Sequence, residues 1–152
     1  MRLLDTMILV YFDRAGLARQ LLALPKIGVT SSVRRELRTW PSLSKAVDSA
    51  LVSGALSLCN LDPGNEEECT LYFFYRDRDG FGDGEATSMA LAYCRGLTFV
   101  THDLASAAKI RRLGIKVLDW QDLAAELAGT GAISSERHER ALREIQRMMR
   151  GR

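Results

Sequence analysis

Residues 82–103 read GDGEATSMALAYCRGLTFVTHD and predict a helix, a tight turn and a buried strand in that order. Four apolar residues recur there at helical spacing and predict one apolar face: Ala86, Met89, Ala90 and Tyr93. Gly96 stands where the end of a helix favours a residue that tolerates positive φ. Residues 97–100 are then apolar and rich in β-formers, which is typical of a strand buried on both faces.

An acidic residue stands near each end of this segment. Glu85 lies at the start of the expected helix, and Asp103 follows the expected strand. If the helix and the strand pack antiparallel, both carboxylates lie at the same rim of one sheet. This rim is therefore the candidate functional site.

The rest of the chain alternates short apolar runs with helical patterns. The expected strands are residues 2–4, 27–30, 55–59, 97–100 and 115–118. This alternation, with few prolines, predicts an α/β fold that forms a three-layer sandwich around a central parallel sheet. A chain of 152 residues is long enough for one domain with a substantial core. We expect that domain at residues 1–130, with residues 131–152 as a helical appendage of it.

Composition argues against several classes of protein. The net charge of +2 excludes a polycation, and two histidines without paired cysteines argue against a structural zinc site. Three cysteines without a CxxC pair are typical of free thiols in a reducing cytoplasm. No apolar run is long enough to cross a membrane, and the N-terminus does not resemble a signal peptide. We therefore expect a cytoplasmic protein.

Two further acids occupy comparable places in the first part of the chain. Asp5 interrupts the apolar segment between Leu4 and Met7, and Glu36 lies in the helix that follows the strand at 27–30. A buried carboxylate is costly unless it is hydrogen-bonded, paired or bound to a metal. The alternatives are that Asp5 caps the next helix or forms a turn, and that Glu36 is a solvated helical glutamate.

Asp5, Glu36, Glu85 and Asp103 would all lie near the carboxyl ends of strands, where open parallel sheets form their sites. Converging carboxylates repel one another and raise each other's pKa values, and a divalent cation removes that repulsion. Oxygen ligands without His or Cys select Mg²⁺ or Mn²⁺. Such ions activate water and stabilise the phosphate, so the pattern indicates phosphoryl chemistry.

Four short motifs stand in the order and approximate positions of PIN-domain motifs. They are LLDTMIL at 3–9, SSVRREL at 31–37, DGEATSMALA at 83–92 and FVTHD at 99–103. The resemblance covers nearly all of residues 1–128. The chain differs from many PIN domains in having Met7 after the Asp–Thr pair, and the GEA context of Glu85 resembles a PIN-like branch.

The resemblance implies a fold, an activity and partners. PIN domains are α/β folds around a parallel sheet, and many are metal-dependent ribonucleases, which are hydrolases. Small stand-alone members are frequently VapC-type toxins that a co-expressed antitoxin holds inactive. The implied cofactor is Mg²⁺ or Mn²⁺, the implied substrate is RNA, and the implied partners are an antitoxin and a second copy of the chain.

The resemblance also assigns residues. The catalytic and metal-binding acids would be, in chain order, Asp5, Glu36, Glu85 and Asp103. Thr6 and Thr101 resemble the hydroxyl residues that flank the first and last acids. Asp83 lies two residues before Glu85 and is an alternative third acid.

The C-terminal residues add a clue that is independent of the resemblance. Residues 134–152 contain six arginines and three glutamates, a net charge of +3, so residues 1–133 carry −1. We expect a helix at 134–150 with one basic face, formed by Arg137, Arg140, Arg143, Arg147 and Arg150. The opposite face is apolar: Ala141, Leu142, Ile145, Met148 and Met149. Arg140, Arg143 and Arg147 are therefore candidate contacts to nucleic acid phosphates, the alternative being ordinary solvated arginines.

Two other functions fit the sequence. A PIN-like fold could act on structured DNA, or it could be a nucleic-acid or protein binding module whose acids hold no metal. A different α/β phosphotransferase would require a lysine at a strand end beside the acids, and no convincing candidate is present.

Overall fold

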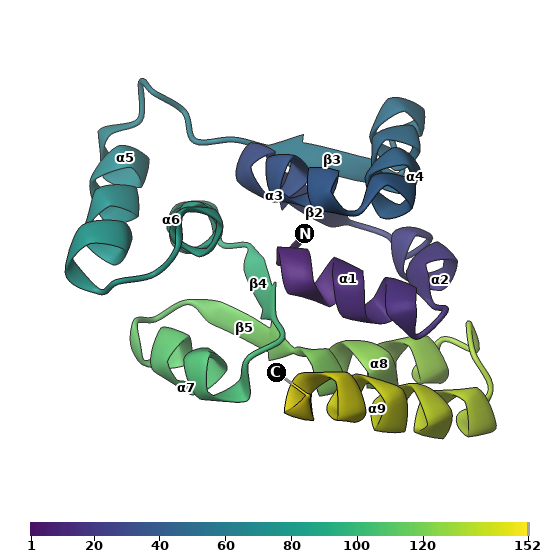
Figure 1. Cartoon of the computed structure of the whole chain (residues 1–152). Coiled ribbons are helices and arrows are strands. Elements are labelled where there is room, and N and C mark those ends of the chain that lie inside the picture. Colours follow the sequence, from purple (N-terminus) through teal and green to yellow (C-terminus); the bar gives the residue numbers. More distant parts are fainter. Residues whose placement is uncertain (152) are drawn as a thin grey trace.

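A computed structural model describes residues 1–151 of the chain; Arg152, the last of the C-terminal arginines, lies outside the described residues (Figure 1). The helices and strands are, in order, β1 (Arg2–Leu4), α1 (Thr6–Arg14), α2 (Ala18–Leu22), β2 (Ile27–Thr30), α3 (Ser31–Glu36), η1 (Leu37–Thr39), α4 (Pro41–Ser53), β3 (Leu56–Cys59), α5 (Glu66–Phe73), η2 (Phe74–Arg78), α6 (Asp83–Arg95), β4 (Thr98–Thr101), α7 (Leu104–Arg112), β5 (Lys116–Asp119), α8 (Trp120–Gly129) and α9 (Ser135–Arg150).

The strands form one five-stranded sheet in the order β3-β2-β1-β4-β5, and every pair is parallel. The first strand of the chain is therefore the central one. Leu3 of β1 pairs with Gly28 of β2 on one side and with Phe99 of β4 on the other. The prediction of an α/β fold with a central parallel sheet is confirmed.

Helices cover both faces of this sheet, which completes the predicted three layers. Figure 1 shows α1, α2, α4, α8 and α9 on one side, and α5, α6 and α7 on the other. Successive residues of a strand point to opposite faces, so β1 contributes to both cores. Leu4 packs in the core beneath α1 and α8, whereas Leu3 packs against Leu91 of α6.

Helix α6 confirms most of its predicted apolar face and corrects one residue. Ala86, Met89 and Ala90 are fully buried, but Tyr93 is 48% exposed. The prediction for Tyr93 was wrong because the buried part of α6 ends at Ala92, so Tyr93 lies in the last, uncovered turn before Arg95. Gly96 ends the helix with φ 64°, as predicted from its position.

Two helical segments are irregular. Helix α1 runs to Arg14 and α2 begins only at Ala18, with Gly16 at φ 76° between them. Helix α5 is α-helical to Phe73 and the chain then continues as the π-helical segment η2.

Helix α9 is amphipathic, as predicted. Ala141 and Ile145 are buried, and α9 packs against α8 and α1. The guanidinium of Arg137 donates a 2.6 Å hydrogen bond to the carbonyl oxygen of Gly16, which joins α9 to the end of α1. Across residues 1–151, no helix is both long and apolar enough to cross a membrane. The three cysteines are free thiols.

Candidate active site

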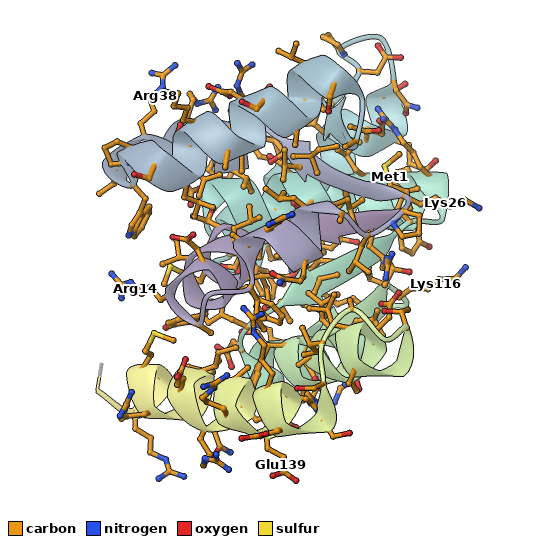
Figure 2. The ribbon with its side chains drawn as sticks, turned by 90° about the vertical axis from the view of Figure 1, so that its right-hand side faces the viewer. Met1, Arg14, Lys26, Arg38, Lys116 and Glu139 are labelled. Atoms are coloured by element: carbon orange, nitrogen blue, oxygen red, sulfur yellow. The ribbon has the colours of Figure 1, made fainter. Side chains whose placement is uncertain are left out.

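The candidate site lies at the edge of the sheet where the parallel strands end. Asp5 directly follows β1, Glu36 is the last residue of α3 after β2, and Asp103 follows β4 at the start of α7. Glu85 lies in the first turn of α6. In Figure 2 the strands run from the edge near Met1, Lys26 and Lys116 toward the opposite edge, where these acids lie.

Asp5 is held by the neighbouring strand and by a histidine. Its backbone N–H donates to the carbonyl oxygen of Val100 at 3.1 Å, so β4 fixes its place. Its side chain makes no capping hydrogen bond to α1, which excludes the helix-cap alternative. Instead, Oδ2 lies 2.8 Å from Nδ1 of His102, whose ring stands 5.8 Å from that of Tyr11.

His102 was missed by sequence reasoning. A lone histidine has no spacing pattern, and the only signal was its place beside Asp103 at the exit of a buried strand. The imidazole can hold Asp5 in one orientation through the contact between their side chains.

Glu36 is an exposed residue whose carboxylate nevertheless contacts α1 and α6. The hydroxyl of Thr6 donates a 2.8 Å hydrogen bond to Oε2. On the other side, Oε1 would be only 2.7 Å from a Cβ atom on Gly84. Thr6 therefore supports the second acid rather than only flanking the first; Glu36 is exposed, as the solvated-glutamate alternative expects, but its carboxylate is anchored.

Glu85 is the acid that responds most to the others. Burial raises the pKa of its carboxyl group, and the negative charges of Asp5, Asp103 and Glu36 raise it further, whereas His102 opposes the shift. A carboxylate responds in this way when like charges are close and water is partly excluded. The structure therefore brings the four predicted acids into one electrostatic environment.

Asp83 is engaged elsewhere. Its carboxylate accepts hydrogen bonds from the hydroxyl of Tyr72 and from that of Ser32, the latter at 3.0 Å, and lies 3.9 Å from the guanidinium of Arg35. The Tyr72 hydrogen bond is the main reason that the pKa of Asp83 is lowered. The charge of Asp83 is thus satisfied by α5 and α3, so Glu85 rather than Asp83 shares the environment of the other acids.

Asp103 has a structural task as well as its place in the site. Its carboxylate accepts from the backbone N–H groups of Ala105 and Ser106 at 2.9 and 3.2 Å, and from the Ser106 hydroxyl, so it caps α7. Burial opposes ionisation, but these hydrogen bonds outweigh it and lower the pKa of Asp103. Thr101 is buried, and its hydroxyl accepts from the backbone N–H of Asp103 at 3.3 Å.

The chemistry of this donor set suits a hard divalent cation. The acids offer carboxylate oxygens, and their mutual repulsion, seen in the raised pKa of Glu85, is what a cation relieves. In their present rotamers, however, no three His, Cys, Asp or Glu side chains within residues 1–151 are close enough together to hold an ion. A shared ion would therefore require changes of rotamer among these side chains.

The three predicted nucleic-acid contacts are not part of this cluster. Arg140, Arg143 and Arg147 lie on the exposed face of α9, which rests on α8 and α1. Figure 1 places α9 across the sheet from α5 and α6.

Comparison with solved structures finds the same fold elsewhere. A chain in the 2.2 Å resolution structure of VapBC-1 from nontypeable Haemophilus influenzae superimposes with a TM-score of 0.54 at 19% sequence identity. The match covers 78% of this chain and 97% of that one. No protein-family model and no curated protein matches the sequence. At this identity the similarity shows a common fold.

Proposed function

We propose that this protein is a Mg²⁺- or Mn²⁺-dependent endoribonuclease that hydrolyses RNA phosphodiester bonds in the cytoplasm as the toxin of a toxin–antitoxin pair. The observation that carries the proposal is the placement of four acids at the carboxyl edge of a parallel sheet, where burial and the charges of the other three acids both raise the pKa of Glu85. The PIN-like motifs and a fold shared with a chain of VapBC-1 support it. That structure is a VapBC complex, which supports a cognate antitoxin here.

Asp5, Glu36, Glu85 and Asp103 would hold the metal. When bound, the metal activates water and stabilises charge on the scissile phosphate. The protein side chains prepare its ligands: Thr6 orients Glu36 by a hydrogen bond, and the Thr101 hydroxyl anchors the backbone of Asp103. We also propose that α9 belongs to the same domain as residues 1–130 and that the protein acts as a homodimer.

A specific observation favours a second candidate. Asp5, Glu36 and Asp103 each have a protein partner in the present rotamers, and no three potential ligands within the described chain surround a common point. This arrangement also fits a PIN-like binding module whose acids hold no metal, whether its ligand is RNA, structured DNA or a protein.

Cleavage assays separate the two candidates. Purified protein is incubated with labelled single-stranded RNA, duplex RNA and structured DNA in Mg²⁺, in Mn²⁺ and in EDTA. The nuclease cleaves RNA in either metal and not in EDTA, and Asp5→Asn abolishes cleavage while leaving the thermal unfolding midpoint in EDTA unchanged or higher. Binding without cleavage in every metal contradicts the nuclease and supports the binding module.

A further inference from the structure

An unusual group of side chains lies on α5 and η2, which both pack against α6. The guanidinium of Arg76 stands 5.2 Å from the ring centroid of Tyr72 and 5.3 Å from that of Phe73, and Arg78 stands 4.7 Å from Phe74. Cation–π contacts occur about once per 70–80 residues, so three within residues 72–78 are a marked concentration. We call these five residues the aromatic platform.

The aromatic platform is open to solvent on a well-packed base. Phe73 is 52% exposed and Phe74 is 37% exposed, whereas the next residue, Tyr75, is buried. Helix α5 packs closely along α6. The platform also falls where the α-helix widens into the π-helical η2, a feature that is frequent at functional sites. The exposed rings of Phe73 and Phe74 are thus held in solvent by helical segments rather than by a loop.

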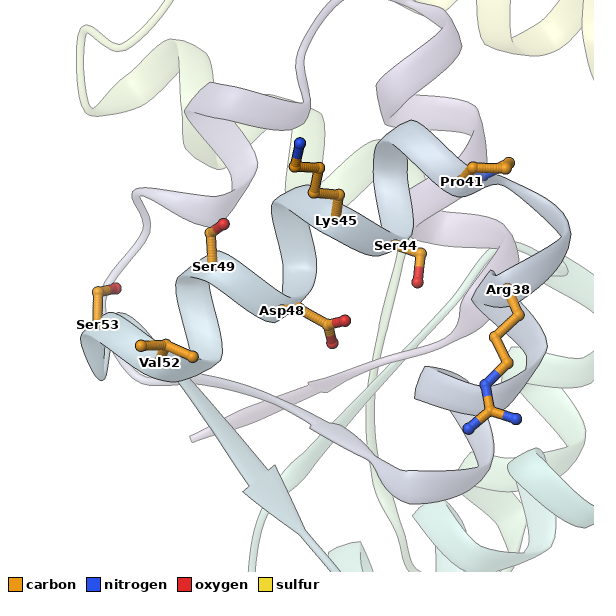
Figure 3. Close-up of a pocket in the computed structure, with 8 residues that line it drawn as sticks. All are labelled: Arg38, Pro41, Ser44, Lys45, Asp48, Ser49, Val52 and Ser53. Atoms are coloured by element: carbon orange, nitrogen blue, oxygen red, sulfur yellow. The ribbon is translucent and has the colours of Figure 1, made fainter.

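Two neighbouring hollows lie between Tyr72 of the platform and the arginines of α3. One has a volume of about 310 Å³ and is bordered by Arg35, Asp83 and Tyr72; the other has a volume of about 350 Å³ and is bordered by Arg34, Arg35 and Arg38. We call these two hollows, which share Arg35 as a lining residue, the arginine groove. It opens onto the outer side of α4, where Arg38 extends on the same side as Ser44 and Asp48 (Figure 3).

The arginine groove carries charge suited to a phosphate backbone. Arg34 is paired with Asp48 at 2.8 Å and Arg35 lies 3.9 Å from Asp83, so both guanidinium groups are oriented by partners. Within residues 1–151, the side chain of Arg38 makes no hydrogen bond or ion pair. Arginine forks match phosphate oxygens and give affinity without sequence choice.

The groove also leads to the acids. Arg35 precedes Glu36 on α3, and Asp83 stands two residues before Glu85 on α6, so the same two helix ends border both features. Neither hollow is lined by the four acids themselves, but a strand that lies in the groove passes the helix ends that carry Glu36 and Glu85.

We propose that the aromatic platform stacks unpaired bases of a single-stranded RNA whose backbone lies in the arginine groove. Every base has a π face, so stacking on aromatic rings and arginine planes is tolerant of sequence but requires a base that is free of a duplex. This inference rests on the proposed function for the identity of the ligand, and adds that the substrate is unpaired at the site. An exposed aromatic surface can also dock a protein, and RNA binding by matched variants separates the two.

The test is RNA binding in EDTA, where metal-dependent cleavage does not occur. The full chain and its variants are titrated into a fluorescein-labelled single-stranded RNA, the same strand without bases, and an RNA duplex. Phe73→Leu keeps apolar bulk but removes the π face, and Arg76→Lys keeps the charge but removes the plane. Stacking predicts that each variant raises the Kd for the single strand about tenfold and leaves the Kd for the baseless strand unchanged.

Tyr93→Leu is the matched control, because Tyr93 is an aromatic of similar exposure, 48%, outside the platform. It should leave every Kd unchanged. An unchanged single-strand Kd in Phe73→Leu, or an equal loss on the baseless strand, overturns the inference and leaves the platform as a protein-docking surface. RNA cleavage is measured separately. Base-dependent binding without cleavage refutes the proposed nuclease activity but not the aromatic platform. Cleavage at the same rate in Phe73→Leu and the wild type, with unchanged binding, refutes the platform but not the nuclease activity.

Discussion

Glu36 rests directly against Gly84: Oε1 of the glutamate would be 2.7 Å from a Cβ atom at residue 84. No side chain fits there without moving the carboxylate. The glycine of the GEA motif is therefore explained by the approach of the second acid to the N-terminus of α6, where the helix dipole also favours a negative charge.

Gly84→Ala should displace Glu36 while the fold remains intact. Residue 84 is helical, so alanine adds up to about 1 kcal/mol of helix stability. This gain offsets the free-energy cost of displacing the Glu36 side chain. We expect RNA cleavage to fall about 100-fold, since a shift near 1 Å in a catalytic group has effects of that order. The measurements are cleavage rate and unfolding midpoint. Gly82→Ala is the control, because its Cβ would meet Glu85 only at 3.8 Å; equal cleavage in the two variants contradicts the proposed role of Gly84.

Asp103 should show two separable roles. Asparagine can replace aspartate as a helix cap, whereas alanine cannot and costs about 1 kcal/mol. Asp103→Asn should therefore abolish cleavage at near-normal stability, and Asp103→Ala should abolish cleavage and lower the free energy of unfolding. Asp119, which caps α8 through the N–H groups of Gln121 and Asp122, provides the control. Asp119→Ala should lower stability similarly and leave cleavage intact; retained cleavage in Asp103→Asn removes Asp103 from the site.

Glu85 should make the metal-free protein less stable as the pH rises. Its pKa is raised in the folded state, so the folded protein binds more protons than the unfolded chain above about pH 4.3, the ordinary pKa of glutamate. Stability should fall through the window between that value and the raised folded-state pKa. Glu85→Gln should be more stable than the wild type at neutral pH, with a flatter pH dependence. Chemical denaturation in EDTA at several pH values measures this, and an unchanged profile in the variant contradicts the prediction.

Manganese binding should distinguish Glu85 from Asp83. Glu85→Gln removes a proposed ligand and should largely abolish binding. Asp83→Asn removes a carboxylate that Tyr72 and Ser32 already engage, so its effect should be about tenfold or less. Calorimetric titration with Mn²⁺ compares the two. A larger loss in Asp83→Asn makes Asp83 the third acid.

The basic face of α9 should contribute to RNA affinity without affecting the metal site. Replacing Arg140, Arg143 and Arg147 together by Gln should weaken binding across sequences and lower the salt slope by roughly 0.7 for each phosphate that is no longer neutralised. The control is the double variant Lys26→Gln with Lys116→Gln, since both lysines lie near Met1 at the edge where the strands begin (Figure 2). A salt slope that does not change in the triple variant removes α9 from the RNA site and leaves it as a packing or partner surface.

The sequence was sufficient to predict a parallel sheet and the approximate positions of the acids along its edge. Apolar runs and helical spacing are local signals, and parallel strands necessarily end at a common edge, so Asp5 and Asp103 could be placed there. The exposure of Tyr93 could not be foreseen, because helical spacing gives the direction of an apolar face but not how far along the helix its neighbours cover that face.

The contacts of the acids were beyond the sequence for the same reason. The choice between Asp83 and Glu85 depends on Tyr72 reaching across from α5, and the orientation of Asp5 depends on His102. The Asp5–His102 contact joins residues 97 positions apart, the Tyr72–Asp83 contact joins two different helical segments, and neither carries a spacing signal. The close approach of Glu36 to Gly84 could not be predicted from the sequence either.

The central position of β1 has a consequence for synthesis. Leu3 can pair with Gly28 early, but its other partner, Phe99, leaves the ribosome only after most of the chain. At roughly 5–20 residues per second, the open edge of β1 waits on the order of several seconds for β4. Until then Asp5 lacks both the Val100 carbonyl and His102. The acid edge is thus assembled only once about two thirds of the chain, as far as Asp103, has emerged.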